Sequence, residues 1–409
     1  MSCSSPWSTA IRGNVYLAPG SQKDAFERLR TSQPFEIFSA SCESGPQPLQ
    51  YQDILSGGST SNYNANTSSV DLAVFANLDT VIRTTRTIRY RPGKSQLVFI
   101  TGNFNGGVAS TNKKIGYFGG ENGIYFELDG TSLYATLRSK TSGAVVNTRY
   151  AQAAWNIDPL DGTGPSGVTL DTTKQQVFVI DFGWLGSAVI RWGFMLEGRI
   201  WYVHQENPSN SLSGPFMAKA SLRVCWEMSS TGGSANLTAT CASVQSEGGF
   251  NSLGVKRSIS NGNTSTALNF GSGDINLVPL LTVRLKSTYP LGLISPTDFT
   301  VFASGNADFE IRILRNCNLS GTTFASASET TEYDSSATNT ITSGEILHCG
   351  YGTGGGGPIK SAASSSILQS DIPISTDFNG VRDTITVAVR PLSGNSTDYY
   401  ASIDWREFY

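Results

Sequence analysis

The sequence predicts an all-β protein with an antiparallel β-sandwich, a second C-terminal β-sandwich unit and an extended N-terminal arm. Its 409 residues include 43 glycines and 10% aromatic residues but only 15% charged residues, a composition typical of strands joined by many turns. Short runs of β-branched and aromatic residues recur along the chain, as expected for strands. A helical pattern occurs at residues 23–30, and we expect one short helix there.

The N-terminal segment, residues 1–69, is expected to be an extended arm followed by a flexible linker. Prolines interrupt its first 50 residues repeatedly and exclude long regular elements. Its apolar side chains would cause aggregation if they were left in water, so the segment packs either on its own domain or on a neighbouring subunit. The candidate assembly contacts are Phe26, Leu29, Arg30, Phe35, Ile37 and Phe38.

Residues 70–290 are expected to form the first sandwich. From residue 70 onward strand-like runs follow one another closely, and Asp129-Gly130 marks a hairpin turn between two of them. The runs that are densest in β-branched and aromatic residues lie at residues 175–182, 188–196 and 200–205. Both faces of these three strands carry apolar residues, so we expect them in the middle of a sheet that is covered on both sides.

Residues 291–409 are expected to form the second sandwich. Strand-like runs lie at residues 299–303, 308–314, 339–347, 384–391 and 400–408. The glycine-rich stretch at residues 350–366 is expected to be a loop, because glycine loses more backbone freedom on ordering than any other residue. Pro279, in the run that precedes this unit, predicts an edge or a bulge.

Charge and cysteine content exclude several classes of function. The net charge is −3 and no basic stripe is present, so we expect no nucleic-acid partner. No apolar run reaches the roughly 20 residues that a membrane helix needs, so we expect no membrane insertion. The six cysteines lie far apart, and free thiols are expected in a chain without a secretory signal. No cofactor or metal motif is present, so neither is expected.

Six segments of the sequence occur in one order and carry a resemblance. They read DAFERLRTSQPFEIFSA, RPGKSQLVFITG, NGIYFELDGT, VFVIDFGWLGSAVIRWGFMLEGRIWYVHQ, LTATCASVQSEGGF and ASIDWREFY. Together they resemble a family of virion structural proteins of tailed bacteriophages, of the type found in marine phages. The resemblance extends from about residue 24 to the C-terminus.

This resemblance implies a structural component of the virion, assembled in the host cytoplasm and displayed on the particle surface. Such a component would be a head decoration, a knob or a fibre-like appendage at the head, neck or tail. The resemblance also implies a homo-oligomer, with a trimer favoured, that binds other virion proteins such as capsid, neck or tail proteins.

Residues 94–205 also resemble the concanavalin-like jelly-roll sandwich of many carbohydrate-binding domains. This second resemblance implies an alternative function, a lectin-like receptor-binding tail protein that recognises glycans on the host surface. Aromatic side chains at loop tips would stack on sugar rings, while Asn and Asp side chains would hold hydroxyl groups. The candidate glycan contacts are Tyr63, Trp155, Asn156, Asp158, Asp161 and Tyr351.

No catalytic residue is expected. The chain has two histidines, His204 and His348, and no G-x-S-x-G elbow. The alternative is a glycosidase, which needs two carboxylates about 5 to 9 Å apart. Glu127 and Asp129 share one face of a strand, and Asp181 and Glu197 come from strands that can be neighbours. Because Asp129 heads a hairpin turn, a structural reason accounts for it, and we expect a protein that is not an enzyme.

Overall fold

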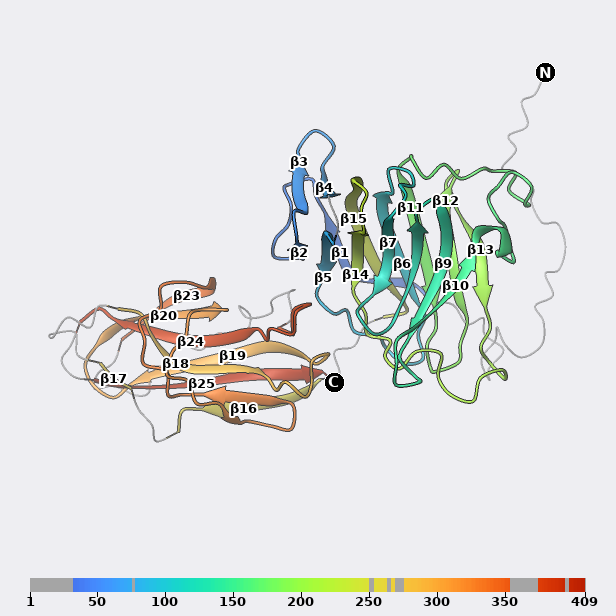
Figure 1. The fold of residues 1–409 in the computed structure, drawn as a ribbon. Coiled ribbons are helices and arrows are strands. Elements are labelled where there is room, and N and C mark those ends of the chain that lie inside the picture. Colours follow the sequence, from blue (N-terminus) through green and yellow to red (C-terminus); the bar gives the residue numbers. More distant parts are fainter. Residues whose placement is uncertain are drawn as a thin grey trace, which may run out of the picture.

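The computed structural model describes residues 32–75, 78–249, 254–262, 266–268, 276–353, 374–393 and 397–408. Figure 1 shows two β-sandwiches that follow one another along the chain. Apart from the single 3₁₀ turn η1 (Gln152–Ala154), the regular elements of the described residues are all strands. The prediction of an all-β protein with two antiparallel sandwiches is therefore confirmed. Over these same residues, no helix has the length and apolar character that crossing a membrane requires.

The first sheet of the first sandwich has eight strands among the described residues. In spatial order they are β13 (Arg199–Glu206), β12 (Ile190–Leu196), β11 (Gln176–Phe182), β6 (Gln96–Asn103), β15 (Ala235–Glu247), β4 (Ser69–Val74) and β3 (Thr60–Asn64), with β1 (Pro34–Ser41) also paired to β15. The long strand β15 serves two partners on the same side, because residues 235–239 pair with β4 and residues 241–247 pair with β1.

The second sheet has seven strands among the described residues. In spatial order they are β10 (Val146–Ala151), β9 (Ser132–Ser139), β8 (Gly123–Asp129), β7 (Thr111–Phe118), β14 (Val224–Ser230), β5 (Thr80–Thr85) and β2 (Tyr51–Ser56). The chain passes between the two sheets repeatedly, after β1, β2, β4, β5, β6, β10, β13 and β14, as in a jelly roll. The two edge strands β13 and β10 end their sheets on the same side of the sandwich.

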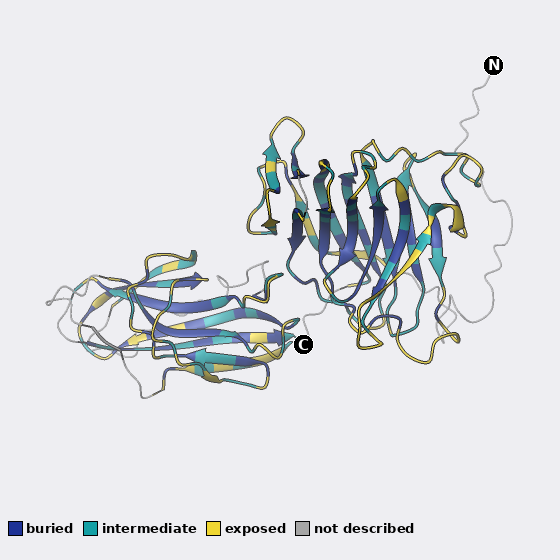
Figure 2. Ribbon diagram, in the orientation of Figure 1, coloured by how far each residue is buried: buried dark blue, intermediate teal, exposed yellow. Residues whose placement is uncertain are grey.

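The core of the first sandwich is aromatic. Phe126 on β8, Phe178 on β11 and Phe194 on β12 lie within 5.5 Å of one another between ring centroids, although they come from opposite sheets. In Figure 2 the strands of both sheets carry long buried stretches. Full burial of one such side chain contributes about 1.5–3 kcal/mol, so these rings fix how the two sheets face one another.

The second sandwich also consists of two antiparallel sheets. One contains β16 (Val255–Ser260), β25 (Thr397–Phe408), β17 (Thr266–Leu268) and β19 (Leu293–Ala303), and the other contains β21 (Ala325–Ser326), β22 (Thr331–Asp334), β18 (Val278–Leu285), β24 (Thr384–Pro391), β20 (Asp308–Arg315) and β23 (Glu345–Thr353). A register shift between Pro279 and Leu281 confirms the bulge predicted at that proline.

The predicted domain boundaries need two corrections. The prediction that residues 1–69 form an arm and linker is wrong for residues 34–64, which form β1, β2 and β3 of the first sandwich. The prediction that the first sandwich extends to residue 290 is also wrong, because β16 and β18 pair with β25 and β24 of the second sandwich. Residues 1–31, including the expected helix at residues 23–30, lie outside the described part of the chain, as do residues 354–366 of the glycine-rich stretch. Residues 350–353 of that stretch belong to β23, so the expectation of a loop is wrong for them.

The three densest strands do not lie in the middle of their sheet as predicted. They are β11, β12 and β13, and β13 is an edge strand. Apolar bulk on their outer face is covered by neighbouring polar side chains instead of by a second layer. The Arg191 guanidinium lies 5.4 Å from the Tyr202 ring centroid, and the Tyr202 hydroxyl donates to Asp181 at 2.8 Å.

The described cysteines are free thiols, as predicted. Cys225 is fully buried on the outer face of the seven-stranded sheet, where Ile82, Phe118 and Tyr125 form a small apolar cluster with it. Burial raises the pKa of the Cys225 thiol well above its usual range. It therefore behaves as a small apolar side chain.

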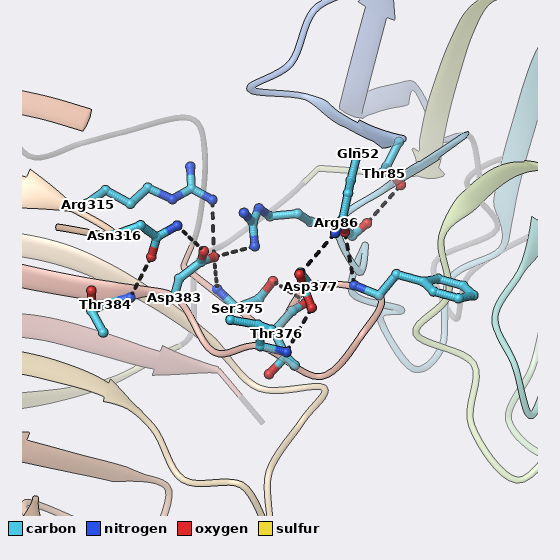
Figure 3. A network of polar contacts seen from close by, with 12 residues as sticks. Gln52, Thr85, Arg86, Arg315, Asn316, Ser375, Thr376, Asp377, Asp383 and Thr384 are labelled. Atoms are coloured by element: carbon cyan, nitrogen blue, oxygen red, sulfur yellow. Dashed lines mark hydrogen bonds and ion pairs between the residues drawn. The ribbon is translucent and has the colours of Figure 1, made fainter. Parts of the chain in front are cut away.

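The loop at residues 374–383 of the second sandwich makes a polar joint with the first (Figure 3). The Gln52 amide donates to the Asp377 carboxylate at 3.0 Å, and Arg86 forms an ion pair with Asp383. Asp383 is 3% exposed and also accepts from Arg315 at 3.1 Å. Phe378 packs against the small apolar cluster around Cys225. Buried polar and apolar contacts thus fix this loop to the first sandwich.

Candidate functional site

A groove of about 900 Å³ opens at the edge of the first sandwich where β10 and β13 end the two sheets. One wall comes from β9 and β10, and the other comes from β12, β13 and residues 208–218. No further strand closes this edge among the described residues. Apolar side chains are consequently left open to solvent, and Val146 and Leu212 on the groove are 49% and 53% exposed.

A cluster of tilted aromatic rings lies at the inner end of the groove. The Tyr150 ring lies 4.2 Å from the His204 ring and 5.9 Å from the Trp192 ring, measured between centroids. Tyr150 lines the groove, whereas Trp192 is fully buried behind it. Burial and the neighbouring Glu206 carboxylate raise the pKa of Tyr150 to about 12, so the phenol stays protonated at neutral pH.

His204 is held neutral within this cluster. Its Nδ1 accepts from the Asn156 backbone N–H at 3.3 Å, and its Nε2 lies 3.2 Å from Glu206 Oε1. Burial lowers the pKa of His204 by more than the Glu206 carboxylate raises it. The hydrogen-bond pattern assigns the proton to Nε2, which donates to Glu206. The imidazole therefore orients the carboxylate at the groove.

The remaining lining of the groove mixes hydroxyl groups with apolar surface. Lys140 lies on the rim and forms an ion pair with Glu121. The hydroxyl side chains that line the groove are Ser139, Thr141, Ser142, Thr148, Ser211 and Ser213. Apolar walls with a few polar groups and one aromatic ring are typical of sites for small, partly polar ligands such as sugars.

The carboxylates weighed for glycosidase chemistry lie elsewhere. Glu127 projects from the outer face of the seven-stranded sheet, is 1% exposed, and accepts from Asn112 at 2.6 Å and Thr136 at 3.1 Å. Arg149 pairs with Glu127 at 2.5 Å and with Asp129 at 3.1 Å. One arginine thus neutralises both carboxylates, and the oxygens of Glu127 are occupied.

The second carboxylate pair is too far apart for a glycosidase. Asp181 pairs in register with Arg191, whereas Glu197 lies at the turn that follows β12. Six residues of strand separate Arg191 from Glu197, or about 20 Å. Asp181 also belongs to the eight-stranded sheet, so it does not share a face with Glu127.

Two of the predicted glycan contacts are buried structural residues. Trp155 is 5% exposed, its ring lies 6.0 Å from Phe126, and its Nε1 donates to the Tyr150 carbonyl at 3.0 Å. Asp158 is 1% exposed and accepts from the Leu160 and Ser166 backbone N–H groups at 2.9 and 2.8 Å. The expectation that they lie at loop tips is wrong. The loop folds back on the core, and the Asp158 carboxylate binds the backbone of that loop from its buried side.

The other four predicted glycan contacts do not converge on one site. Asn156 clamps the backbone of Gln205 with hydrogen bonds of 2.8 and 2.9 Å, and Asp161 binds Thr163 within its own loop. The Tyr63 hydroxyl donates to the Cys42 carbonyl at 2.9 Å. Tyr351 is 74% exposed on β23 of the second sandwich.

The predicted assembly contacts fall into three groups: two pack on their own domain, one is exposed, and three lie outside the described residues. Ile37 and Phe38 on β1 pack against the core of their own domain, and the Phe38 ring lies 6.1 Å from Tyr51. Phe35 is 40% exposed. Phe26, Leu29 and Arg30 lie outside the described residues. For β1, packing on its own domain is the alternative that holds.

The groove residues Tyr150, Glu206 and Lys140 were missed by sequence reasoning. They lie on strands and on a hairpin loop, where the sequence gives only an alternating pattern. Their convergence depends on which strands form the two edges, and strand order is a long-range property. The chain offers one local signal, a run of exposed polar residues on β10.

Comparison with known proteins gives fold likeness alone. No protein-family model and no curated protein matches the chain. An endo-1,3-beta-glucanase from Streptomyces sioyaensis is 10% identical and covers 57% of this chain and 100% of its own, with a TM-score of 0.35. The carbohydrate recognition domain of Emp46p is 10% identical and covers 52% of this chain and 97% of its own, with a TM-score of 0.33.

A third similar structure is a Bacteroides ovatus GH16 protein of a mixed-linkage glucan locus in complex with a G4G4G3G product. It is 6% identical and covers 51% of this chain and 99% of its own, with a TM-score of 0.35. These similarities are too distant to assign a ligand or a reaction to this chain.

Proposed function

We propose that the chain is a structural protein of a tailed-bacteriophage virion that acts by assembly and adhesion and not by catalysis. The resemblance of six ordered sequence segments to virion structural proteins supports the viral part of this proposal. The observation that carries the non-catalytic part is the saturation of Glu127, whose carboxylate is buried, paired with Arg149 and bound to two further donors.

The architecture suits a component that bears mechanical load. A loop of the second sandwich, residues 374–383, contacts the first sandwich through buried polar groups. Its Asp383 carboxylate lies between Arg86 and Arg315 (Figure 3). Removing one partner of a buried ion pair typically costs about 3–5 kcal/mol, so such a joint resists opening. A surface decoration, knob or fibre-like appendage, built as a homo-oligomer, needs this kind of fixed geometry.

This proposal is tested by separating lysates of the phage that encodes the chain on a density gradient. An antibody against the protein should detect it in the fractions that contain infectious particles, and its abundance by mass spectrometry should match a multi-copy structural protein. A chain that remains with the soluble host proteins contradicts a virion role.

A second candidate function is recognition of host-surface glycans by the groove. Tyr150 offers a ring face, Glu206 and the hydroxyl side chains offer acceptors and donors, and the apolar walls suit the apolar faces of a sugar. In this case the protein would be a lectin-like receptor-binding protein of the tail.

A glycan array tests this second candidate. Glu206→Gln with Lys140→Ala should weaken binding of any positive glycan at least about tenfold, since two hydrogen bonds from charged groups are lost. Asp161→Asn, in an exposed loop that does not line the groove, is the matched control and should bind normally. An array without any positive glycan, or equal binding by all variants, would rule out the groove.

A further inference from the structure

The edge strand β10 has an open outer side. Its pairing with β9 is regular from Val146 to Ala151, without a bulge. Among the described residues, the backbone of residues 146–149 forms no backbone hydrogen bond to any segment other than β9. Natural sheets usually protect a regular edge of this kind, because its free N–H and C=O groups pair readily with another extended segment.

The other edge strand at the groove, β13, differs because its backbone is already bound. The Val203 carbonyl accepts from the backbone N–H groups of Ile157 and Asp158, both at 3.1 Å. The Asn156 side chain binds the Gln205 N–H at 2.9 Å and the Gln205 carbonyl at 2.8 Å. Of the two edges, β10 is therefore the one that can accept a further strand.

The side chains of β10 alternate between the groove and the outer face of the sheet. Val146, Thr148 and Tyr150 line the groove, whereas Arg149 binds Glu127 on the outer face. A strand added beside β10 would continue this alternation, so that every second side chain would enter the groove. The groove is therefore suited to an extended segment with apolar residues at alternate positions.

The N-terminal part of the sequence contains a segment with this pattern. Residues 10–18 read AIRGNVYLA and lie outside the described part of the chain. In an extended strand Ile11, Val15 and Leu17 would share one face, and the single charged residue, Arg12, would lie on the other. The spacing of the apolar residues therefore matches the spacing that β10 imposes on the groove.

The chain enters the described structure at the end of the eight-stranded sheet where the groove lies. One row of paired residues crosses this sheet through Phe35, Ser246, Gln96, Phe182, Ile190 and Glu206. The last two residues of the row line the groove. At about 4.8 Å per strand spacing, the row is about 24 Å long. Residues 19–31 span up to about 43 Å when extended, at about 3.3 Å per residue, so residues 10–18 of the same chain can reach the groove.

We propose that residues 10–18 add to β10 of the same chain as a further edge strand, with Ile11, Val15 and Leu17 in the groove. The same chain is favoured over a second copy because a short tether holds the segment at an effective concentration in the millimolar range. The inference goes beyond the proposed virion role. It also means that a glycan would have to displace the segment, because both need the same space.

Hydrogen exchange of the full chain tests this proposal. Val15→Asp/Leu17→Asp places two charges where the groove is apolar, so the segment should leave β10, and exchange of the β10 amides should become at least about tenfold faster. Tyr16→Asp, on the opposite face of the segment, is the matched control and should exchange as the wild type does. Equal exchange of β10 in the wild type and the double variant overturns the proposal.

A variant of the groove tests the same contact from the other side. Val146 is 49% exposed, so Val146→Asp should fold normally but release the segment. Trypsin cleavage after Arg12 should then become at least about tenfold faster, because a paired strand resists proteolysis. Val145→Asp is the matched control, since Val145 is 46% exposed and does not line the groove. Unchanged cleavage in Val146→Asp overturns the proposal.

A photoreactive benzoylphenylalanine at position 15 of the full chain distinguishes the same chain from a second copy. Cross-links to residues that line the groove should appear in the monomeric band of a denaturing gel, at a yield that does not depend on protein concentration. Cross-links that occur only in a dimeric band, or that reach no residue of the groove, overturn the proposal.

Discussion

Glu127 projects from β8 onto the outer face of the seven-stranded sheet, where Arg149, Asn112 and Thr136 occupy its oxygens. A glycosidase needs one carboxyl group that delivers a proton and a second that attacks or activates water. Neither role is open to a buried carboxylate whose oxygens already accept three interactions. At this position a carboxylate stabilises the face of a sheet by binding β7, β9 and β10 together.

We expect Glu127→Gln and Asp181→Asn to change stability but no activity. Glu127→Gln weakens hydrogen bonds to a buried charged group, whereas Arg149 is 37% exposed and keeps its pair with Asp129, so the free energy of unfolding should fall by about 1.5–3 kcal/mol. The more exposed pair of Asp181 with Arg191 should contribute less than about 1 kcal/mol. Chemical denaturation measures both values. Polysaccharide cleavage by the native protein that either variant abolishes would contradict the structural role.

His204 makes stability depend on pH near neutrality. Burial lowers its pKa below the usual 6.5, so between these two values the unfolded chain binds more protons than the folded one. The stabilising contribution of the neutral imidazole is therefore complete above pH 6.5 and is lost as the pH falls through the lowered pKa. The slope can reach about 1.4 kcal/mol per pH unit.

The variant His204→Asn should flatten this slope between pH 7.5 and about 5.5, because its amide oxygen can still accept from Asn156 but does not titrate. His348→Asn is the matched control. Burial also lowers the pKa of His348, but that residue contacts Phe299 in the second sandwich and is less buried, so its effect should be smaller. An unchanged slope in His204→Asn would show that other groups cause the pH dependence.

At the scale of elements, the sequence predicts strands well and their order poorly. The runs at residues 175–205 are β11, β12 and β13, and the predicted turn between the last two has positive φ at Glu197 and Gly198. Their place at the edge of the sheet was not predictable from local pattern, because edge or centre depends on which distant strand pairs beside them. The open groove follows from that order and was missed for the same reason.

The pairing of β1 also could not be predicted from local sequence. Residues 34–41 lie between prolines and were assigned to an arm, yet they pair with β15, about 200 residues later in the sequence, and contribute Ile37 and Phe38 to the core. The apolar content was interpreted correctly as a need for packing. The partner could not be identified, because strand pairing at this separation leaves no local signal.

Two deletions distinguish β1 from the segment before it. Removal of residues 1–31 should leave the melting temperature within a few degrees of that of the full chain. Removal of residues 1–40 should lower the free energy of unfolding by at least about 2 kcal/mol, because Ile37 and Phe38 leave the core. Circular dichroism with thermal melting measures both. Equal stability of the two truncated proteins would contradict the role of β1 in the sandwich.

The shorter deletion also tests the proposed arm. If residues 1–31 contact a neighbouring subunit, the truncated protein should remain folded but lose its oligomeric state in analytical ultracentrifugation. A truncated protein that stays oligomeric would place the subunit contacts on the body of the molecule.

At the scale of the whole molecule, the joint determines how the sandwiches act together. Arg86 belongs to the first sandwich and Asp383 to the second, and the same carboxylate binds Arg315, Asn316 and the Ser375 backbone (Figure 3). The Asp383 carboxylate is thus ordered by its own domain before it meets Arg86. Such preorganisation favours one fixed arrangement of the two domains.

We expect Arg86→Gln to uncouple the domains without unfolding either one. Calorimetry should show two separate transitions in the variant where the wild type shows closely overlapping ones, since the inter-domain ion pair is lost and the contacts inside each sandwich remain. Arg149→Gln removes an ion pair inside the first sandwich and is the matched control, with a lower but undivided transition. Identical thermograms for wild type and Arg86→Gln would mean that the joint does not couple the domains.

The most direct test of the proposed virion role is a cryo-electron microscopy reconstruction of intact virus particles purified from lysates that contain this chain. We expect symmetric copies of a two-sandwich density, in contact at residues 374–383, on the surface of the head, neck or tail. The position of the groove would then show whether it faces the host, as a receptor-binding protein requires. A reconstruction in which every surface density is assigned to other proteins, together with absence of this chain from the particle by mass spectrometry, would contradict the proposal.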